Sequence, residues 1–477
     1  MATVEPNLYP ATIAGQIERL QTAKADLKTA IEGKGVTVPS STKLDGYADL
    51  VDSIETGGGG SASPQENDVT FYDYDGTIVA SYSASDFANL TSLPNNPDHT
   101  SEGLTAQGWN WSLSDAKTYV ASYNKLNIGQ MYITTDNATK FYIDTSEWYL
   151  LDIPYLKYTQ TKANGVAIDW GDHTATQRTA GTGAKTVRHT YENKGNYIIS
   201  FLQDNDCTLT FSNSSSNTIF CSTPNTGGVK IQKVLNKIQI GKNTTLSDYA
   251  FHLCFSLSNI PMPTTITALG QYSFYKCYNL NSIIIPNTVT SLGAYLFADC
   301  RTLKYVSLPR TINSIPSRCF SDCSDLDSIT IPNTVTKIDS YAFSGCYSLS
   351  NIIIPSSVTD IEDYAFQHCG SLEALILADG IKNIKDYVFN YCSALNFVDL
   401  PSSIKTIGRS SFSAYKNHIT FIIRATTPPT LQSVSNGGSF GYETNIEGIY
   451  VPDESVETYK ATYTGYASKI KGISERT

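Results

Sequence analysis

Phenylalanine recurs every 23 residues through the C-terminal half of this 477-residue chain. The eight positions are Phe251, Phe274, Phe297, Phe320, Phe343, Phe366, Phe389 and Phe412. Cysteine follows three residues later in seven of these units, at Cys254, Cys277, Cys300, Cys323, Cys346, Cys369 and Cys392. Self-similarity at a fixed period in this range is typical of a solenoid, in which each repeat is one coil stacked on the next. The sequence therefore predicts an elongated stack with aromatic and thiol columns inside it.

The remaining positions of each repeat predict its local structure. A leucine precedes a short alternating apolar run that ends at proline, as between Leu280 and Pro286. Alternation predicts a strand, and proline ends strand pairing because it has no N–H group. Phe297, Cys300 and Leu303 follow one another at a spacing of three, which suits a single helical or 3₁₀ turn. We expect one strand, two bends and one short helical turn in every coil.

These repeats resemble a known family. The stretch from Ile331 to Leu349 carries Pro332, Val335, Ile338, Ala342, Phe343 and Cys346. It is similar to the treponemal (BspA-type) leucine-rich repeats, and the resemblance covers about residues 228–425. The resemblance implies the solenoid fold and an adhesive module, because the family occurs in bacterial and protist surface proteins and in phage structural proteins.

The cysteine column predicts buried free thiols. A repeated interior position is filled by small apolar side chains, and cysteine behaves as one. Parallel Cβ vectors in stacked coils give poor disulfide geometry, and no Cys-x-x-Cys pair indicates a metal site. Cys319 falls in the position that alanine takes in Ile331–Leu349.

The chain is thus predicted to be multidomain and mainly β. The expected parts are an N-terminal helical docking module (1–56), a Gly/Ser linker (57–65), a small aromatic-rich β domain (66–150), a β-sandwich (151–226), the leucine-rich-repeat solenoid (227–425) and a C-terminal strand–helix cap (426–477). In the cap, Ser455–Tyr466 is expected to form a helix with Val456, Tyr459 and Tyr463 on one face and Ser455 as N-cap.

The first 56 residues carry apolar side chains at helical spacing, and the segment from Ala23 to Ile54 resembles the N-terminal module of tailed-phage structural proteins. The apolar positions of the first expected helix are Ile13, Ile17, Leu20, Leu27 and Ile31. The resemblance implies docking onto a virus particle. Any small helical docking or oligomerisation module would give the same pattern.

Residues 151–226 resemble a polycystic-kidney-disease (PKD) domain. The residues that carry the resemblance are Trp170, Gly171 and Asp172, then His189 and Tyr191, then Gly195 and Tyr197, with His173 departing from the pattern. The resemblance implies structural roles for them, so we expect a spacer domain. Asp172 and His189 without a third candidate ligand predict a hydrogen-bonded turn rather than a metal site.

The segment from Asp73 to Thr77 resembles the nucleophile loop of haloacid-dehalogenase-type phosphatases. That resemblance would make Asp73 a nucleophile and Asp75 a general acid or base around Mg²⁺. The following residues lack the alternation of strands and helices, the downstream lysine and the acidic pair that this chemistry needs. Asp75-Gly76 is therefore expected to form a hairpin turn, and we predict no enzyme activity, cofactor or metal.

The composition and the first residues of the chain limit the kinds of partner and the cellular location that we expect. A net charge of −10 argues against a nucleic-acid partner. The chain contains no run of 18 apolar residues, so we predict no membrane span. The first residues lack the basic and apolar regions of a Sec signal peptide. A virion protein, assembled in the host cytoplasm and released by lysis, is the expectation that fits these observations.

The outward strand positions, among them Ile353 and Ile376, change from coil to coil beside a constant framework, which is the pattern expected of a recognition surface. The candidate ligand-binding residues are Ser282, Tyr305, Ser328, Asn351, Phe397 and Asp399. Free drift of solvent-facing positions would give the same variation. A nearly constant tyrosine column, interrupted at Arg318, indicates a structural ladder instead.

The sequence favours a non-enzymatic phage tail or head fibre that docks through its N-terminus and binds a bacterial surface glycan or protein through the solenoid. Multivalent weak contacts would supply affinity. A bacterial adhesin exported without a Sec signal and a purely structural decoration protein are the alternatives. A trimer is compatible with the fibre hypothesis.

Overall fold

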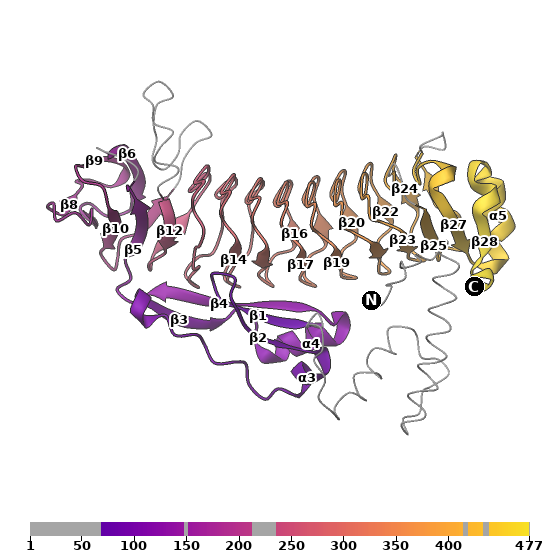
Figure 1. Cartoon of the computed structure of the whole chain (residues 1–477), viewed down its shortest axis with the longest axis horizontal. Coiled ribbons are helices and arrows are strands. Elements are labelled where there is room, and N and C mark those ends of the chain that lie inside the picture. Colours follow the sequence, from indigo (N-terminus) through magenta and orange to yellow (C-terminus); the bar gives the residue numbers. More distant parts are fainter. Residues whose placement is uncertain (1–67, 147–150, 212–234, 414–417, 433–437, 477) are drawn as a thin grey trace, which may run out of the picture.

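The computed structural model describes residues 68–146, 151–211, 235–413, 418–432 and 438–476 (Figure 1). The predicted docking module and linker lie outside these residues. The described chain is mainly β and contains an α/β domain, a β-sandwich and a long solenoid, which Figure 1 shows as a row of parallel coils. No helix among the described residues has the length and apolar character to cross a membrane.

The segment predicted as a small β domain is an α/β domain, which we define as residues 68–134. Its elements are β1 Val69–Tyr72, β2 Ile78–Tyr82, α3 Ala84–Asn89, the 3₁₀ helix η1 Thr100–Glu102, β3 Leu104–Trp109, α4 Leu113–Tyr123 and β4 Leu126–Thr134. The sheet order is β2-β1-β4-β3, with β1 parallel to β4. The predicted hairpin turn connects β1 and β2, and Gly76 supplies its left-handed residue at φ 88°.

Helix α4 was not predicted from the sequence. Ser112 accepts a hydrogen bond from the backbone N–H of Asp115, as an N-cap residue does. Ala116, Tyr119 and Val120 are buried on one side of the helix. The preceding Trp109-Asn110-Trp111 run lies in the aromatic-rich segment predicted to be a β domain, and Trp111 packs on Tyr119 in the core between helix and sheet.

The sandwich consists of two sheets in the orders β12-β5-β10-β7-β8 and β13-β11-β6-β9. The strands are β5 Thr139–Asp144, β6 Leu151–Gln160, β7 Val166–Asp169, β8 Gln177–Arg178, β9 Gly183–Tyr191, β10 Asn196–Gln203, β11 Leu209–Phe211, β12 Leu235–Gln239 and β13 Thr244–Leu246. Strand β5 precedes the predicted boundary at residue 150 and yet pairs within the sandwich.

The sandwich closes the first end of the solenoid rather than acting as a spacer. Strand β12 pairs with β5 of the sandwich, and its Lys237 bridges to Asn259 of the next coil. The ring of Phe251 in the first coil lies 5.7 Å from that of Phe141 and 5.8 Å from that of Phe211. One hydrophobic core therefore runs from the sandwich into the coils.

Two series of parallel strands run along the solenoid, one more than the sequence predicted. The first comprises β14 Ser282–Ile284, β15 Tyr305–Ser307, β17 Ser328–Thr330, β19 Asn351–Ile353, β21 Ala374–Ile376, β23 Phe397–Leu400, β25 Ile419–Ile423, β27 Ile446–Val451 and β28 Ile470–Gly472. Its hydrogen bonds form three sheets, β14-β15, β17-β19 and β21-β23-β25-β27-β28. The second contains β16 Ser314–Ile315, β18 Lys337–Ile338, β20 Asp360–Ile361, β22 Asn383–Ile384, β24 Thr406–Ile407 and β26 Thr430–Leu431. A run of turns with i to i−3 hydrogen bonds completes each coil.

The predicted interior columns are confirmed. Successive phenylalanine rings stack at 5.2 to 5.9 Å. The seven column cysteines are free and buried, and burial raises the pKa of the Cys346 thiol. From Cys277 onward each thiol donates to the carbonyl of the phenylalanine one coil earlier, as Cys300 does to Phe274 at 3.0 Å. Each of these carbonyls also accepts the backbone N–H of the cysteine in its own coil, so the thiol adds a second hydrogen bond that links adjacent coils.

The tyrosine column is a stacked ladder at a sharp corner of the coils. Ring centroids lie 4.4 to 4.8 Å apart, and the Arg318 guanidinium fills the gap, 3.9 Å from the ring of Tyr341. All seven residues of the column have left-handed backbone angles, between 55° and 61° in φ. This conformation costs a non-glycine residue about 1–2 kcal/mol. Ring stacking and backbone hydrogen bonds to the next coil hold it in place.

The C-terminal cap was predicted in outline. Strand β27 is followed by η4 Asp453–Ser455, α5 Val456–Thr462, η5 Thr464–Lys469 and η6 Ile473–Glu475, while η3 Glu443–Asn445 precedes β27. Tyr459 and Tyr463 are buried, and the Tyr459 hydroxyl donates to the carbonyl of Ala425 at 2.7 Å. The expected N-cap is wrong in detail, because the buried Ser455 side chain makes no capping hydrogen bond.

Candidate recognition surface

The first series of solenoid strands presents two rows of outward positions, which we call the strand face. In-register pairing within β14–β15, β17–β19 and β21–β23, together with the constant 23-residue spacing, aligns the positions. The first row contains Ser282, Tyr305, Ser328, Ala374 and Phe397, with the backbone of Asn351 at the equivalent position, and the second row contains Ile284, Ser307, Thr330, Ile353, Ile376 and Asp399. The intervening residues, such as Ile283 and Val306, are buried in the core. All six predicted ligand-binding residues therefore belong to one face.

The α/β domain covers the first half of the strand face, from β14 to β17 (Figure 1). Ser282 donates to the carbonyl of Tyr74 at 2.8 Å, and Ser307 donates to the carbonyl of Asn127 at 3.1 Å. The rings of Tyr72 and Tyr305 pack at 4.5 Å. The solenoid hydroxyls thus bind backbone oxygens of the domain.

Ile284 is buried at the centre of an apolar cluster in this interface. It packs with Tyr72 and Met131 and is 2% exposed. It lies over Gly129 of β4, where an added Cβ would come within 2.4 Å of the Ile284 Cγ2 atom. Glycine is required at this position because only its missing side chain leaves room for the isoleucine.

Helix α4 and the loop before it attach the helical side of the domain to the solenoid. The Tyr119 hydroxyl donates to the carbonyl of Ile331 at 2.8 Å. Arg310 forms an ion pair with Asp115 and lies 5.1 Å from the centre of the Trp111 ring. The domain is therefore held against the coils at both the sheet and the helix.

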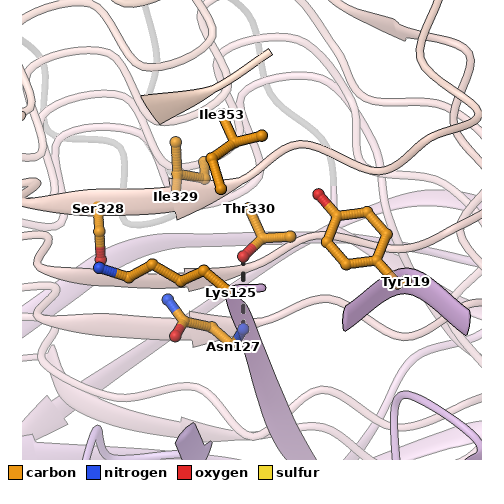
Figure 2. A pocket seen from close by; sticks show the side chains of 7 residues that line it. All are labelled: Tyr119, Lys125, Asn127, Ser328, Ile329, Thr330 and Ile353. Carbon is orange, nitrogen blue, oxygen red and sulfur yellow. Dashed lines mark hydrogen bonds between the residues drawn. The ribbon is translucent and has the colours of Figure 1, made fainter. Parts of the chain in front are cut away.

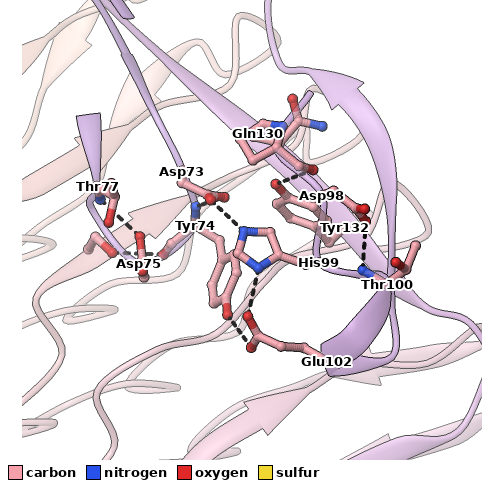
Figure 3. A network of polar contacts seen from close by, with 12 residues as sticks. Asp73, Tyr74, Asp75, Thr77, Asp98, His99, Thr100, Glu102, Gln130 and Tyr132 are labelled. Atoms are coloured by element: carbon pink, nitrogen blue, oxygen red, sulfur yellow. Dashed lines mark hydrogen bonds and ion pairs between the residues drawn. The ribbon is translucent and has the colours of Figure 1, made fainter. Parts of the chain in front are cut away.

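A polar network around His99 lies within the α/β domain (Figure 3) and is joined to β12 through Lys237. His99 lies 2.6 Å from both Asp73 Oδ2 and Glu102 Oε1. Glu102 Oε2 accepts from the Tyr74 hydroxyl at 2.9 Å and from Lys237 of β12 at 2.5 Å. Asp73 Oδ1 also accepts from the backbone N–H of Tyr74. Both oxygens of the phosphatase-like Asp73 are thus engaged in structural hydrogen bonds.

This network shifts the pKa values of its members. Burial disfavours the charged form of Glu102, but hydrogen bonds from Lys237, His99 and Tyr74 outweigh it and lower the pKa to about 2. Burial also opposes the charged form of His99, while its hydrogen bonds to Asp73 and Glu102 raise its pKa above the ordinary value. Charge on both residues therefore favours the docked arrangement.

The predicted ligand-binding residues differ in accessibility. Ser282 is fully buried beneath the domain, and Tyr305 is half-buried against Tyr72, so neither presents the free surface expected of it. Ser328 lies at the edge of the domain. The backbone of Asn351 pairs with Ser328 in the expected register, and its side chain lies outside the described part of the structure.

The far end of the strand face is covered by other side chains. The Arg424 guanidinium donates to both oxygens of Asp399, the shorter contact being 2.5 Å, and Asp399 is 6% exposed. The Arg476 guanidinium lies 5.1 Å from the centre of the Phe397 ring. Asp399 is therefore a poor candidate for contacting a ligand directly, because its charge is already paired.

Between these covered ends, β19 and β21 form an open window. Ile353 is 36% exposed and Ile376 is 66% exposed, and Ala374 is exposed beside them. A small pocket lies where the window meets the domain (Figure 2). Its lining residues are Tyr119, Lys125, Asn127, Ser328, Ile329, Thr330 and Ile353. The Asn127 backbone N–H donates to the Thr330 hydroxyl at 3.4 Å across this junction.

No pattern in the sequence indicates the residues that border the window. Tyr119, Lys125, Arg424 and Arg476 come from separate elements and share no spacing with the 23-residue repeat. Ile353 and Ile376 were recognised as outward, but nothing local distinguishes them from the buried Ile284. Only the docked position of the α/β domain makes that distinction.

The sandwich turn matches its predicted geometry. His189 Nε2 lies 2.7 Å from Asp172 Oδ2, and the His189 ring stacks on Trp170 at 4.4 Å. The Tyr191 hydroxyl donates to the carbonyl of Trp170. Within the described ranges, no group of three or more His, Cys, Asp or Glu side chains is placed to hold a metal ion.

Comparison with known proteins confirms the nature of the repeats. Residues 244–373 and 313–447 match the BspA type leucine rich repeat region, with six copies. Residues 244–447 therefore consist of BspA-type leucine-rich repeats. No curated protein matches the chain. The resemblances of residues 1–56 to phage modules and of residues 151–226 to PKD domains stay predictions.

Several solved structures are similar to this chain. The T. pallidum leucine-rich repeat protein is 26% identical over 38% of this chain and 81% of its own, with a TM-score of 0.30. The pneumococcal vaccine antigen PcpA is 19% identical over 50% of this chain and 66% of its own, with a TM-score of 0.32. A leucine-rich cell surface protein from Faecalibacterium prausnitzii A2-165 is 19% identical over 57% of this chain and 92% of its own, with a TM-score of 0.28.

Proposed function

We propose that the chain is a non-enzymatic binding protein of a phage particle, a tail or head fibre, whose solenoid attaches to a molecule on the bacterial surface. The N-terminal 56 residues would connect it to other virion proteins. The solenoid would supply a rigid recognition surface, and the open window is where we expect contact with the target.

One observation carries the binding role. Ile353 and Ile376, with Ala374 beside them, are exposed in the middle of a face where Ile284 is buried beneath the α/β domain. Exposed aliphatic side chains that lie next to each other and are rimmed by polar groups are typical of interaction sites. The framework beneath them is fixed by the phenylalanine and cysteine columns, so binding requires little reordering of the backbone.

The binding role is tested with labelled full-length chain and a panel of intact bacterial strains. Ile376→Lys places a charge in the window and is expected to reduce binding to the recognised strain at least tenfold. Ile78→Lys is the matched control, because Ile78 is also an exposed isoleucine, at 54%, on edge strand β2. Equal binding by both variants would exclude the window. Failure to bind any strain would favour a decoration protein.

A further inference from the structure

The strand face already binds a protein surface within this molecule. Strand β4 of the α/β domain lies across β14, β15 and β17 of the solenoid. The hydroxyls of Ser282 and Ser307 donate to backbone carbonyls of the domain. Ile284 occupies the space that Gly129 leaves open in β4. This contact shows what kind of surface fits an isoleucine of the second row: an extended strand with a glycine opposite it.

The open window repeats the same chemistry without a covering strand. Ile353 and Ile376 are at the same position of the 23-residue repeat as Ile284, the last residue of a three-residue strand in each coil. They are 36% and 66% exposed, against 2% for Ile284. The window is continuous with the covered half, because Ser328 and Thr330 of the neighbouring coil contribute to the pocket at the domain edge.

The boundaries of the window limit the size of a partner. It spans two coils, which is about 10 Å at the usual strand spacing. Tyr119 and Lys125 of the α/β domain stand on one side, and the pairs Arg424–Asp399 and Arg476–Phe397 lie on the other. This width suits a single extended segment and is too narrow for the face of a second solenoid.

The chemistry of the window favours protein over glycan. Among the described side chains of the window, the exposed Ile353, Ala374 and Ile376 have no hydrogen-bonding groups, so sugar hydroxyls buried against them would lose their partners. The aromatic columns of the solenoid do not offer ring faces on which a sugar could stack, because these faces stack on one another. Apolar contact at the centre with polar groups at the rim is the usual arrangement of a protein interface.

We propose that Ile353 and Ile376 dock an extended segment of a partner protein that carries glycine or alanine where it crosses the two isoleucines. This inference rests on the proposed function and specifies the chemical class of its target. The partner would imitate the way that β4 lies over Ile284. Affinity would come from burying the two side chains, and selectivity from the small residues that make room for them.

The test uses full-length chain and a displayed library of random 12-residue peptides. Selection is run in parallel on the wild-type chain, on the double variant Ile353→Lys/Ile376→Lys and on the control Ile78→Lys. We expect the wild type and the control to enrich peptides with glycine or alanine between apolar residues, and the double variant to bind these peptides at least tenfold more weakly. Replacing the small residue of a selected peptide by valine is expected to cause a similar loss.

Several results would overturn the inference. They are no enrichment on the wild type, equal binding of the peptides by the double variant, selected peptides without small residues, or window-dependent binding on a glycan array probed with the same proteins. Unchanged hydrogen exchange in β4 and β14 of the double variant verifies that the fold is retained. Window-dependent peptide binding without attachment to any cell would contradict the proposed function alone.

Discussion

The covered and open halves of the strand face are built from the same repeat and differ in what lies over them. In the covered half, Ile284 is inserted over Gly129 and has almost no exposed surface. In the open half, Ile376 has the same position in its coil and is two-thirds exposed. Position within a repeat therefore determines which way a side chain points, and the neighbouring domain determines whether it is available.

The largest difference between the halves is expected for truncation of the isoleucines. Ile284→Ala should lower the free energy that holds the α/β domain on the solenoid by about 2–4 kcal/mol, because a buried side chain is removed without collapse of the space. Ile376→Ala should change stability by no more than about 0.5 kcal/mol, since its side chain is mostly in water. Native-state hydrogen exchange in β4 and β14 measures both values. Equal effects would contradict the docked arrangement.

The glycine beneath Ile284 offers a second comparison. Gly129→Ala introduces a Cβ that would lie 2.4 Å from the Ile284 Cγ2 atom, so we expect a loss of about 1–3 kcal/mol from overpacking. Gly465→Ala is the control, because a Cβ there meets nothing within 4 Å. Combining Gly129→Ala with Ile284→Ala should restore part of the loss. A purely additive double variant would show that the two residues do not meet.

The far boundary of the window depends on a buried carboxylate. The Asp399 side chain is 9% exposed beside Arg424, and Arg424→Ala removes its cation, which should cost about 1–2 kcal/mol in thermal or urea unfolding. Arg409→Ala removes a comparable pair with Asp386, whose side chain is 24% exposed, and should cost less than about 1 kcal/mol. Similar losses of stability in Arg424→Ala and Arg409→Ala would mean that the Asp399 carboxylate is better hydrated than its contacts indicate.

The network around His99 makes docking of the covered half depend on pH. The lowered pKa of Glu102 contributes stability that is present above its ordinary value of 4.5 and is lost as pH falls toward 2. The raised pKa of His99 contributes stability that is complete below its ordinary value of 6.5 and is lost as pH rises through the raised value. The urea midpoint of the wild type should therefore exceed that of His99→Gln most clearly near pH 5–6.

The acidic and alkaline parts of this pH dependence are tested with different variants. The difference between the wild type and Glu102→Gln should disappear as pH approaches 2, whereas the difference from His99→Gln should shrink on the alkaline side. Ile376→Ala should follow the wild-type profile throughout, because the open half contains no part of the network. A pH-independent difference for His99→Gln would indicate that the ring contributes only packing.

The repeats were predictable because their information is local and periodic. The phenylalanine and cysteine columns, the outward rows and the tyrosine ladder all follow from one spacing, and each residue is stacked on its own equivalents. The second sheet escaped prediction because its strands are two residues long. Left-handed tyrosines were also unexpected, since that backbone region normally selects glycine or asparagine.

The candidate site could be predicted only in part. Ile353, Ile376 and Asp399 were correctly assigned to the outward face, but their exposure depends on contacts with residues that have no spacing in common with them. Gly129 reads as an ordinary glycine in a strand until Ile284 is placed over it. Lys125 and Arg476 likewise become relevant only through long-range packing, which no pattern in a single sequence encodes.

The stacked construction makes the gap between the α/β domain and the Arg424 pair adjustable in discrete steps. A tandem duplication of one 23-residue unit after Ile331 would insert one more coil and widen the gap by about 4.8 Å, while every contact under the domain stayed in place. Loss of a unit would close it by the same amount. Recombination between neighbouring repeats could thus alter the length of target that fits, without any point substitution and without disturbing the attachment of the domain.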